Sequence, residues 1–258
     1  MNKITFILST GRTGTQFFRD YINNSCQNAQ CLHEPKPSRH LKFLSNLYLQ
    51  DKLSDSAIYT IYKKSRGKVF KKLNGIDHYI ESSNFMFGCI PALNKYISDL
   101  KILHLVRDPF TYIQSHLNHG FWHGYKKFTA KYVPYWIENL NLKKECKDNP
   151  VYLLAARWIY VNRQISAYDR SNPYMLVRFE DLFNNNRILG AQKLSEIRDF
   201  LELESVSIKQ NEQLLRMSRN ASRKNVKWQI DDNMLHYLIT NGNDLLKKYG
   251  YNLESVNK

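Results

Sequence analysis

The sequence predicts an α/β fold, a three-layer sandwich with a central, mostly parallel sheet and helical insertions. Short apolar runs alternate with helical patterns along the 258 residues. The first run leads through a glycine-containing loop into a helical pattern, which is the order of a phosphate-binding strand–loop–helix. No repeat, low-complexity tract or Pro/Gly-rich linker divides the chain, so we expect one domain over residues 1–258.

The expected elements follow from apolar runs and helix signals. Strands are expected at Lys3–Ser9, His78–Ser82, Lys101–Val106 and Tyr174–Arg178. Helices are expected at 15–24, 40–64, 109–119 and 150–168, and across 190–248 with a polar loop near 218–227. Asp108 followed by Pro109 is typical of a helix start, with the aspartate as N-cap and the proline at the first helical position.

Composition restricts the class of protein. No stretch approaches the roughly 20 apolar residues of a membrane span, and the first apolar run is too short for a signal peptide, so we expect a cytoplasmic protein. Lys and Arg outnumber Asp and Glu by 38 to 23, and the net charge of +15 favours anionic partners. The basic pairs are spread along the chain, which is typical of solvated helix faces.

Cysteine usage points to no metal or redox motif. The four cysteines are Cys26, Cys31, Cys89 and Cys146, and none forms a C-x-x-C pair. A Cys26–Cys31 disulfide is conceivable, but reduced thiols are expected in the cytoplasm.

The loop after the first strand combines features of an anion site. Loop amides and the first N–H groups of a helix converge there, and Arg12 adds a positive charge. A nucleoside-triphosphate loop needs the pattern G-x-x-x-x-G-K-[ST], but here the two glycines are three residues apart and no lysine follows the second. The alternative is a plain strand-to-helix turn with Thr13 or Thr15 as N-cap.

Four separated segments together resemble the sulfotransferases that use 3′-phosphoadenosine 5′-phosphosulfate (PAPS). They are Ser9–Thr15; Ile102–Pro109 with Ser115; Leu176–Leu182; and the C-terminal pieces Arg223–Trp228 and Leu245–Tyr251. The resemblance covers nearly the whole chain and is closest in pattern to bacterial and glycan-type members. It implies a PAPS-dependent sulfotransferase whose desulfated product is PAP.

The resemblance also implies a cofactor site without metal. The residues expected to hold the 5′-phosphosulfate are Gly11, Arg12, Thr13, Gly14, Thr15 and Gln16. Arg107 and Ser115 resemble the 3′-phosphate site, and Arg223 and Lys224 belong to the cofactor-binding C-terminal segment. Arg12 would also stabilise the leaving phosphate, because its planar, permanently charged fork can bind two groups at once.

An acceptor hydroxyl must lose its proton, so the reaction needs a base. Glu34 is the first candidate, because glycan-modifying relatives carry a catalytic glutamate at a similar place, and His33 is the second. The alternative is that Glu34 only occupies an extended turn before Pro35.

The expected acceptor is a glycan, a glycolipid or a small alcohol, with Trp122 and Tyr125 of the aromatic stretch 121–136 as substrate-binding residues. Packing of that stretch on the core is the alternative. We expect no nucleic acid partner, and weak contact with a membrane surface stays open. His116, His119 and His123 have helical spacing, but Gly120 interrupts the helix and no metal is expected.

Two rival functions remain: a nucleotide-dependent phosphotransferase, and a non-catalytic basic module that binds nucleic acid or acidic glycan.

Overall fold

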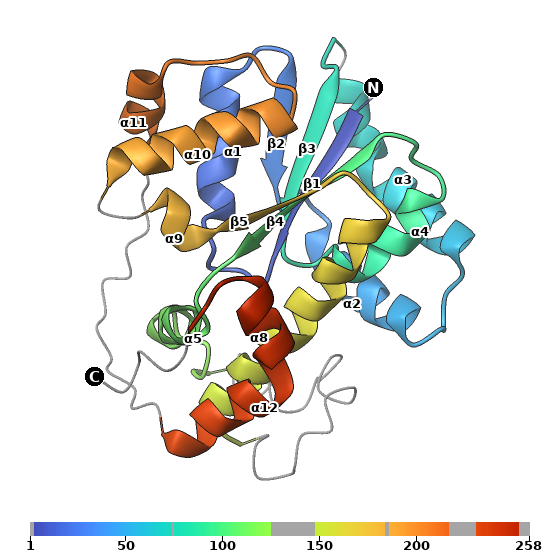
Figure 1. Cartoon of the computed structure of the whole chain (residues 1–258). Coiled ribbons are helices and arrows are strands. Elements are labelled where there is room, and N and C mark those ends of the chain that lie inside the picture. The colour runs from blue at the N-terminus through green and yellow to red at the C-terminus, as the bar shows by residue number, and fades with distance from the viewer. Residues whose placement is uncertain (1–2, 74, 125–147, 184–185, 217–230, 253–258) are drawn as a thin grey trace. The chain divides into compact units, whose positions relative to one another are not determined.

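A computed structural model describes residues 3–73, 75–124, 148–183, 186–216 and 231–252. Within these ranges the chain forms two compact units (Figure 1). The first comprises Met1–Leu105 and Gln164–Arg219, and the second comprises Val106–Arg163 and Asn220–Lys258.

The first unit is built on a five-stranded parallel sheet, which confirms the predicted fold class. The strands are β1 (Lys3–Ser9), β2 (Ala29–His33), β3 (His78–Ser83), β4 (Leu100–Val106) and β5 (Tyr174–Arg178). Their order in the sheet is β2-β3-β1-β4-β5. The three interior strands are buried, apart from the first two residues of β1, because helices cover the two faces of the sheet, as all-parallel sheets require.

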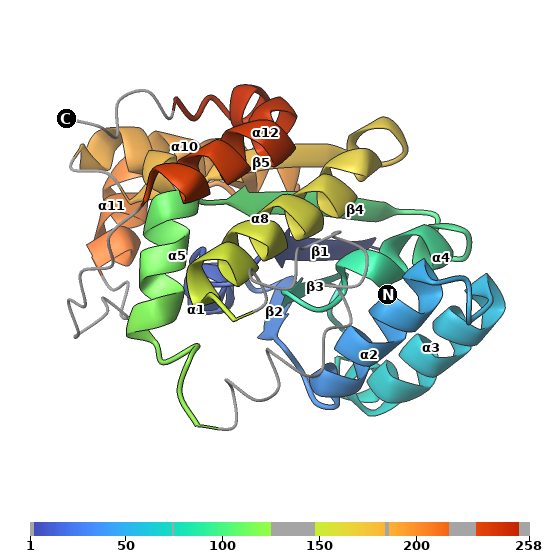
Figure 2. The same ribbon diagram turned by 90° about the horizontal axis from the view of Figure 1, so that it is seen from below.

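Helices lie on either side of this sheet (Figures 1 and 2). One face carries α1 (Thr15–Ser25), α10 (Arg187–Phe200) and α11 (Ile208–Arg216). The other carries α2 (Ser38–Leu49), α3 (Asp55–Lys72) and α4 (Ile90–Asn94). The short helices η1 (Phe87–Cys89), η3 (Ala167–Arg170) and α9 (Phe179–Leu182) complete the unit.

Two expectations about this unit are wrong. The helix expected at 40–64 is two helices, because α2 ends before Asp51 and the Oγ of Ser54 starts α3 by accepting from the N–H of Ala57 at 3.3 Å. The strand β2 was not predicted at all. Its sequence, AQCLH, is short and not rich in β-branched residues, so it is a strand because it pairs in parallel with β3.

The face under α1 and α10 contains a cluster of buried apolar side chains. Its fully buried members include Ile7, Phe18, Ile80, Leu103 and Leu194. A polar network also ties the helices of this face together: the hydroxyl of Tyr21 in α1 donates to Oδ1 of Asn211 in α11 at 2.8 Å. Nη1 of Arg198 in α10 donates to the Oγ of Ser25 at 2.8 Å, so the position of α1 is fixed by hydrogen bonds as well as by packing.

The described residues of the second unit form the helices α5 (Pro109–Asn118), most of α8 (Pro150–Ser166) and α12 (Asp232–Lys248). Trp158 of α8 is fully buried against the ring of Tyr249, with ring centroids 5.9 Å apart. Gly242 of α12 lets that helix approach α8 closely, because an added Cβ would lie 3.0 Å from Ile159. The expected helix start at Asp108 is confirmed, since its carboxylate accepts from the N–H of Thr111 at 2.9 Å.

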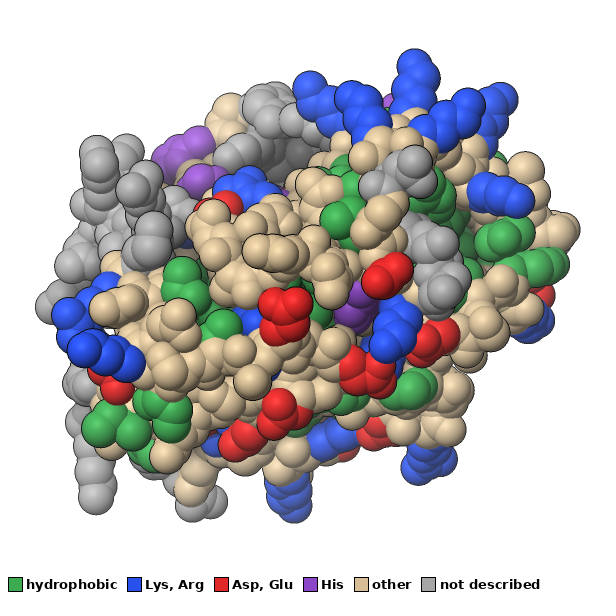
Figure 3. Space-filling model, turned by 90° about the horizontal axis from the view of Figure 1, so that it is seen from above, with side chains coloured by type: hydrophobic (Ala, Val, Ile, Leu, Met, Phe, Trp, Pro, Cys, Tyr) green, Lys and Arg blue, Asp and Glu red, His purple; other side chains and the backbone are tan. Residues whose placement is uncertain are grey.

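The surface charge is distributed as expected for solvated helices. The lysine pairs 63–64, 71–72 and 247–248 are exposed on α3 and α12. Acidic and basic side chains are intermixed over the middle of the face in Figure 3, while Lys and Arg gather at its upper right. Among the described residues, no helix is long and apolar enough to cross a membrane.

Candidate functional site

The loop between β1 and α1 has a tightly turned backbone. Gly11, Arg12 and Gly14 all have positive φ, at 88°, 59° and 86°. The N–H of Gly11 donates to the Oγ of Ser9 at 3.0 Å, which closes the loop onto the end of β1. Two glycines supply conformations that other residues rarely adopt, so the loop can bend its amides toward one point.

Helix α1 begins without a side-chain cap. Its N-cap is Gly14, not Thr13 or Thr15, and no side-chain cap hydrogen bond is made there. Helices α3, α5, α10 and α12 all have a side-chain cap. The first turn of α1 also contains no acidic residue, so its N–H groups and the positive end of its dipole suit an anion from outside the helix.

Two buried hydroxyl groups in this loop have no hydrogen-bond partner among the described residues. They are Oγ1 of Thr10 and Oγ1 of Thr13, and both side chains are 0% exposed. Leaving a buried hydroxyl unpaired costs about 1–3 kcal/mol, and native proteins rarely retain such groups. A phosphate or sulfate group offers several acceptor oxygens, so the residues present fit an anion bound in the loop.

Gly14 is required by its surroundings as well as by its backbone. A Cβ added there would lie 3.0 Å from the ring of Phe183, which follows α9. The same ring packs edge-on against Phe17, with centroids 5.2 Å apart. The start of α1 is therefore braced by an aromatic contact from a distant part of the chain.

Arg12 combines an unusual backbone conformation with partial burial. Burial lowers the pKa of its guanidinium, which nevertheless stays charged in proteins. Four described non-glycine residues have positive φ, and two of them, Asp51 and Glu202, simply follow the last turn of a helix. The others, Arg12 and Glu34, follow strands, and strained backbone of this kind is concentrated at functional sites.

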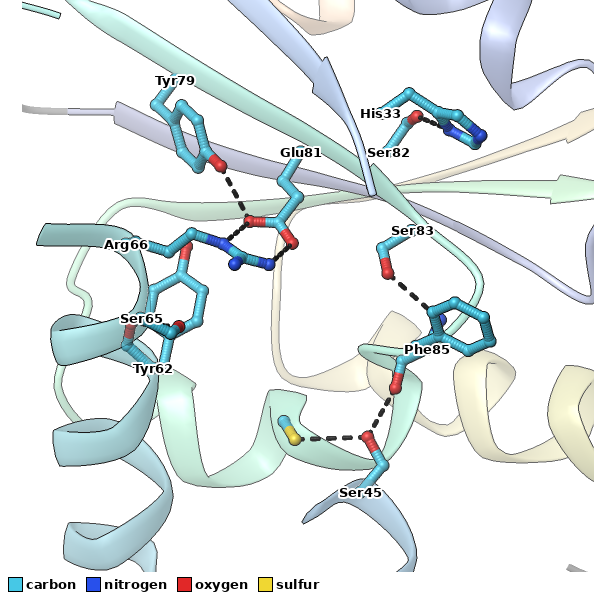
Figure 4. Close-up of polar contacts among 11 residues, drawn as sticks. His33, Ser45, Tyr62, Ser65, Arg66, Tyr79, Glu81, Ser82, Ser83 and Phe85 are labelled. Carbon is cyan, nitrogen blue, oxygen red and sulfur yellow. Dashed lines mark hydrogen bonds and ion pairs between the residues drawn. The ribbon is translucent and has the colours of Figure 1, made fainter. Parts of the chain in front are cut away.

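The end of β2 carries both candidate bases. Nδ1 of His33 and Oγ of Ser82 are 2.8 Å apart (Figure 4). The N–H of Glu34 donates to the carbonyl of Ser82 at 3.0 Å. Glu34 does not have the extended backbone of the turn considered as the alternative to a catalytic role, because its φ is 44°. Burial, followed by the positive charge of Arg19, lowers the pKa of His33, so its ring is held neutral more strongly than in solution.

The sheet order makes the ends of β1 and β4 the natural ligand site of this unit. These strands are parallel neighbours, with Ser9 opposite Leu105. The connection after β1 leads past β3 to β2, whereas β5 lies on the other side of β4. Ligands of open α/β sheets bind where the connections diverge in this way, and the anion loop begins directly after Ser9.

In the second unit, the first turns of α5 arrange the residues expected to bind the other phosphate. Nε of Arg107 donates to Oγ1 of Thr111 at 3.1 Å, and the indole of Trp158 donates to the carbonyl of Arg107 at 2.8 Å. Ser115 follows Thr111 by one helical turn and therefore shares its face. Arg107 is thus held against the helix face that carries Ser115.

For the remaining residues expected at the site, the structure shows less about their role. Tyr125, Arg223 and Lys224 lie outside the described residues, as does most of the aromatic stretch. Trp122 is half-buried and stacks on Phe121, with centroids 6.2 Å apart. Cys26, Cys31 and Cys89 are free thiols. Nowhere in the described ranges do three His, Cys, Asp or Glu side chains come together as they would around a metal ion.

Sequence reasoning missed four residues that shape these sites: Thr10, Ser82, Thr111 and Phe183. Thr10 lies inside the loop motif and could have been included from its position alone. Thr111 is four residues from both Arg107 and Ser115, a spacing that places it on their helix face. Ser82 lies at the end of a predicted strand, where it could touch a ligand, but the sequence assigns it no role. Phe183 reaches the site only through the tertiary fold, and no local signal identifies it.

The fold is similar to that of known sulfotransferases. The crystal structure of a sulfotransferase from Alicyclobacillus acidocaldarius matches with a TM-score of 0.58 and 13% identity, over 100% of both chains. The sulfotransferase domain from the curacin biosynthetic pathway matches with a TM-score of 0.54 and 16% identity, over 98% of this chain and 99% of that one. No protein-family model and no curated protein sequence matches the chain. The likeness at these identities establishes a sulfotransferase fold.

Proposed function

We propose that this protein is a sulfotransferase that moves a sulfuryl group from PAPS to an acceptor hydroxyl. The fold supports the class of enzyme. The observation that carries the proposal is the pair of buried, unpartnered hydroxyls of Thr10 and Thr13, in a loop that opens onto an uncapped helix. When bound, PAPS supplies the sulfuryl group and a phosphate as leaving group.

The loop 10–16 is proposed to hold the phosphosulfate end. The threonine hydroxyls would donate to anionic oxygens, and the first N–H groups of α1 would add further donors. Arg12 would stabilise the negative charge that develops on the leaving phosphate, a role that suits a fixed guanidinium in a partly desolvated position. These residues need no metal ion to neutralise the anion.

Arg107 and Ser115 are proposed to bind the second phosphate of the same cofactor. Arg107 is the second residue after Leu105, whose partner in β1 immediately precedes the anion loop. Its contact with Thr111 keeps the guanidinium along the helix face of Ser115. Arg223 and Lys224 remain proposed contributors on the family resemblance alone.

The proton of the acceptor is proposed to pass to one of the two residues at the end of β2. Glu34 is the carboxylate expected from glycan-type relatives, and its backbone is fixed by Ser82. His33 is the alternative, with its ring held by the hydroxyl of the same serine. Both are half-buried, so either can meet a bound hydroxyl.

The acceptor is proposed to be a glycan or glycolipid, in a cytoplasmic enzyme. The resemblance of Glu34 to the base of glycan-type relatives supports this class, and the net charge of +15 suits an acidic polymer. Trp122 and Tyr125 are proposed to contact the acceptor through their aromatic faces.

Calorimetric titration with PAP in the absence of magnesium tests the cofactor assignment. We expect saturable binding that Arg12→Ala and Arg107→Ala each weaken by at least about tenfold, the size of a lost charged hydrogen bond. Arg187→Ala is the matched control, because it removes an exposed arginine from the start of α10. Absence of PAP binding by the intact chain would overturn the proposal.

Turnover then separates the proposed enzyme from its rivals. With PAPS and acceptor alcohols, Arg12→Ala should lose orders of magnitude in kcat while the fold stays intact. Glu34→Gln and His33→Gln should leave PAP affinity unchanged, and the variant that loses transfer identifies the base. Transfer that requires magnesium would point instead to a phosphotransferase, and binding of polyanions without transfer would point to a binding module.

A further inference from the structure

We infer that Ser82 is a positioning residue that holds His33 as its Nδ1–H tautomer, so that Nε2 of His33 is the atom that accepts the acceptor's proton. The inference rests on the proposed sulfotransferase function and selects between its two candidate bases. Among the described residues Ser82 is the side chain that hydrogen-bonds to His33.

Pairing of β2 with β3 brings the two residues together. His33 is the last residue of β2, and Ser82 is its partner in the register of β3. The distance from Nδ1 to Oγ is 2.8 Å, and Ser82 is 0% exposed (Figure 4). Such a short contact to a fully buried hydroxyl fixes the orientation of the ring.

The direction of the hydrogen bond between His33 and Ser82 follows from a third group, the backbone carbonyl of Thr15. The hydroxyl of Ser82 lies 3.2 Å from the carbonyl oxygen of Thr15. A carbonyl can only accept, so the single proton of Ser82 is directed to Thr15 and its oxygen is left to accept from His33. Nδ1 of His33 therefore carries the proton, and the lone pair of the neutral ring is on Nε2.

The surroundings also favour the neutral ring that a base requires. Burial is the largest influence and lowers the pKa of His33, and the charge of Arg19 on α1 acts in the same direction. A hydrogen bond with the backbone of Ser82 and the charge of Asp20 oppose this shift without reversing it. A histidine in this state can take a proton near neutral pH.

The contact with Thr15 links the base to the anion loop. Thr15 is the first residue of α1, whose uncapped N-terminus we propose as the phosphate site. One buried serine thus sets the ring of His33 relative to the helix end that would hold the sulfuryl donor. Transfer demands such alignment, because misplacement by about 1 Å can cost about a hundredfold in rate.

Ser82 also allows the two candidate bases to be separated. Its backbone carbonyl accepts from Glu34, whereas its hydroxyl contacts His33. Ser82→Ala removes only the hydroxyl and keeps the backbone contact. If Glu34 were the base, this substitution should therefore leave transfer nearly unchanged.

The experiment measures the tautomer and the rate in the same set of variants. Nitrogen-15 NMR of the full chain, with His33→Gln to assign the resonances, reports which ring nitrogen of His33 carries the proton. We expect Nδ1–H in the wild type, appearance of the Nε2–H form in Ser82→Ala, and restoration by Ser82→Thr. We expect kcat for PAPS-dependent transfer to fall about tenfold in Ser82→Ala with PAP affinity unchanged.

Ser83→Ala is the matched control. Ser83 is an equally buried serine on the same strand, but its Oγ accepts from the N–H of Phe85 at 3.1 Å and does not contact His33 (Figure 4). This variant should keep both the tautomer and the pH profile of kcat. If Ser83→Ala lost as much activity as Ser82→Ala, the loss would be explained by altered packing of the strand, and the inference would be overturned.

Two further results would overturn the inference. One is a wild-type His33 that carries its proton on Nε2, a result that needs no variant to fold. The other is a Ser82→Ala enzyme with an altered tautomer and normal kcat. A wild-type chain that binds no PAP and transfers no sulfuryl group contradicts the proposed function instead, while the tautomer measurement still decides what Ser82 does.

Discussion

Arg66 of α3 and Glu81 of β3 form a two-point ion pair inside the first unit. Nε of Arg66 donates to Oε2 of Glu81 at 2.8 Å, and Nη2 donates to Oε1 at 2.6 Å (Figure 4). Both side chains are 0% exposed, and the hydroxyl of Tyr79 donates to the same carboxylate at 2.8 Å. The pair lies on the α3 face of the strand that presents Ser82 to α1 on the other face.

Breaking this pair should be costly because it leaves a charge buried. We expect Glu81→Ala to lower the free energy of unfolding by about 3–5 kcal/mol, measured by urea denaturation. Glu196→Ala is the control, since Glu196 pairs with Lys193 at the surface and should cost less than about 1 kcal/mol. The double variant Arg66→Met/Glu81→Leu should recover most of the loss, and equal losses in the two single glutamate variants would refute the explanation.

Removal of the Thr13 hydroxyl should not destabilise the ligand-free protein. Thr13→Val removes a buried hydroxyl that has no hydrogen-bond partner among the described residues, so the free energy of unfolding should stay the same or rise by about 1 kcal/mol, while PAP affinity falls. Thr5→Val is the opposite case, because Oγ1 of Thr5 is 2.8 Å from Nε2 of His78. That variant should lose about 1 kcal/mol and retain PAP affinity. Destabilisation of the ligand-free protein by Thr13→Val would show that its hydroxyl already has a partner.

Gly14 should tolerate substitution less well than a glycine with the same φ in open space. Gly75 has a φ of 88°, and an added Cβ there would meet nothing within 4 Å. Gly75→Ala should therefore cost about 1–2 kcal/mol from backbone strain alone. Gly14→Ala adds the collision with Phe183, so it should cost more and should weaken PAP binding. In the double variant Gly14→Ala/Phe183→Leu, the smaller side chain should restore part of the lost stability. If it restored none, the cost of Gly14→Ala would come from backbone strain alone.

Stability should fall as the pH drops below neutral because of His78. Burial, reinforced by Lys101 and Lys3, lowers the pKa of His78 to about 4, whereas an unfolded histidine titrates near 6.5. The folded state therefore resists protonation of His78. The contribution of neutral His78 to the free energy of unfolding is complete above pH 6.5 and is lost as the pH falls toward 4. The shift corresponds to roughly 3 kcal/mol.

Urea denaturation between pH 7 and pH 4 measures this loss. His78→Gln should flatten the decline over that range, whereas His236→Gln, at an exposed position on α12, should leave it unchanged. The pKa of Glu202 is lowered to about 2 by its hydrogen bonds with Lys101 and Lys3, so its own effect belongs to more acid conditions. A wild-type stability that is flat down to pH 4 would contradict the assignment.

Much of the fold and of the anion loop could be predicted from the sequence because the signals are local. The first strand, its glycines and the following amphipathic helix are contiguous, and the structure places them as a strand, a loop with positive φ and α1. Asp108 and Pro109 are also contiguous signals, and the cap on Thr111 confirms them.

What could not be predicted depends on pairing between distant segments. β2 has little β propensity of its own and is stabilised by β3. Without that strand, nothing in the sequence indicates that Ser82 lies opposite His33. The break between α2 and α3 is a different case, because Ser54 followed by Asp55 is a recognisable helix start that the apolar periodicity across 40–64 concealed.

The packing of Phe183 against Phe17 at the start of α1 bears on the order in which the protein matures during synthesis. The anion loop leaves the ribosome before the ring that braces it, because Phe183 is encoded after β5 and α9. A nascent chain that ends before α9 therefore exposes Phe17 and the start of α1 to water. Ribosome-bound chains should acquire affinity for PAP only once residues beyond Phe183 have emerged from the exit tunnel.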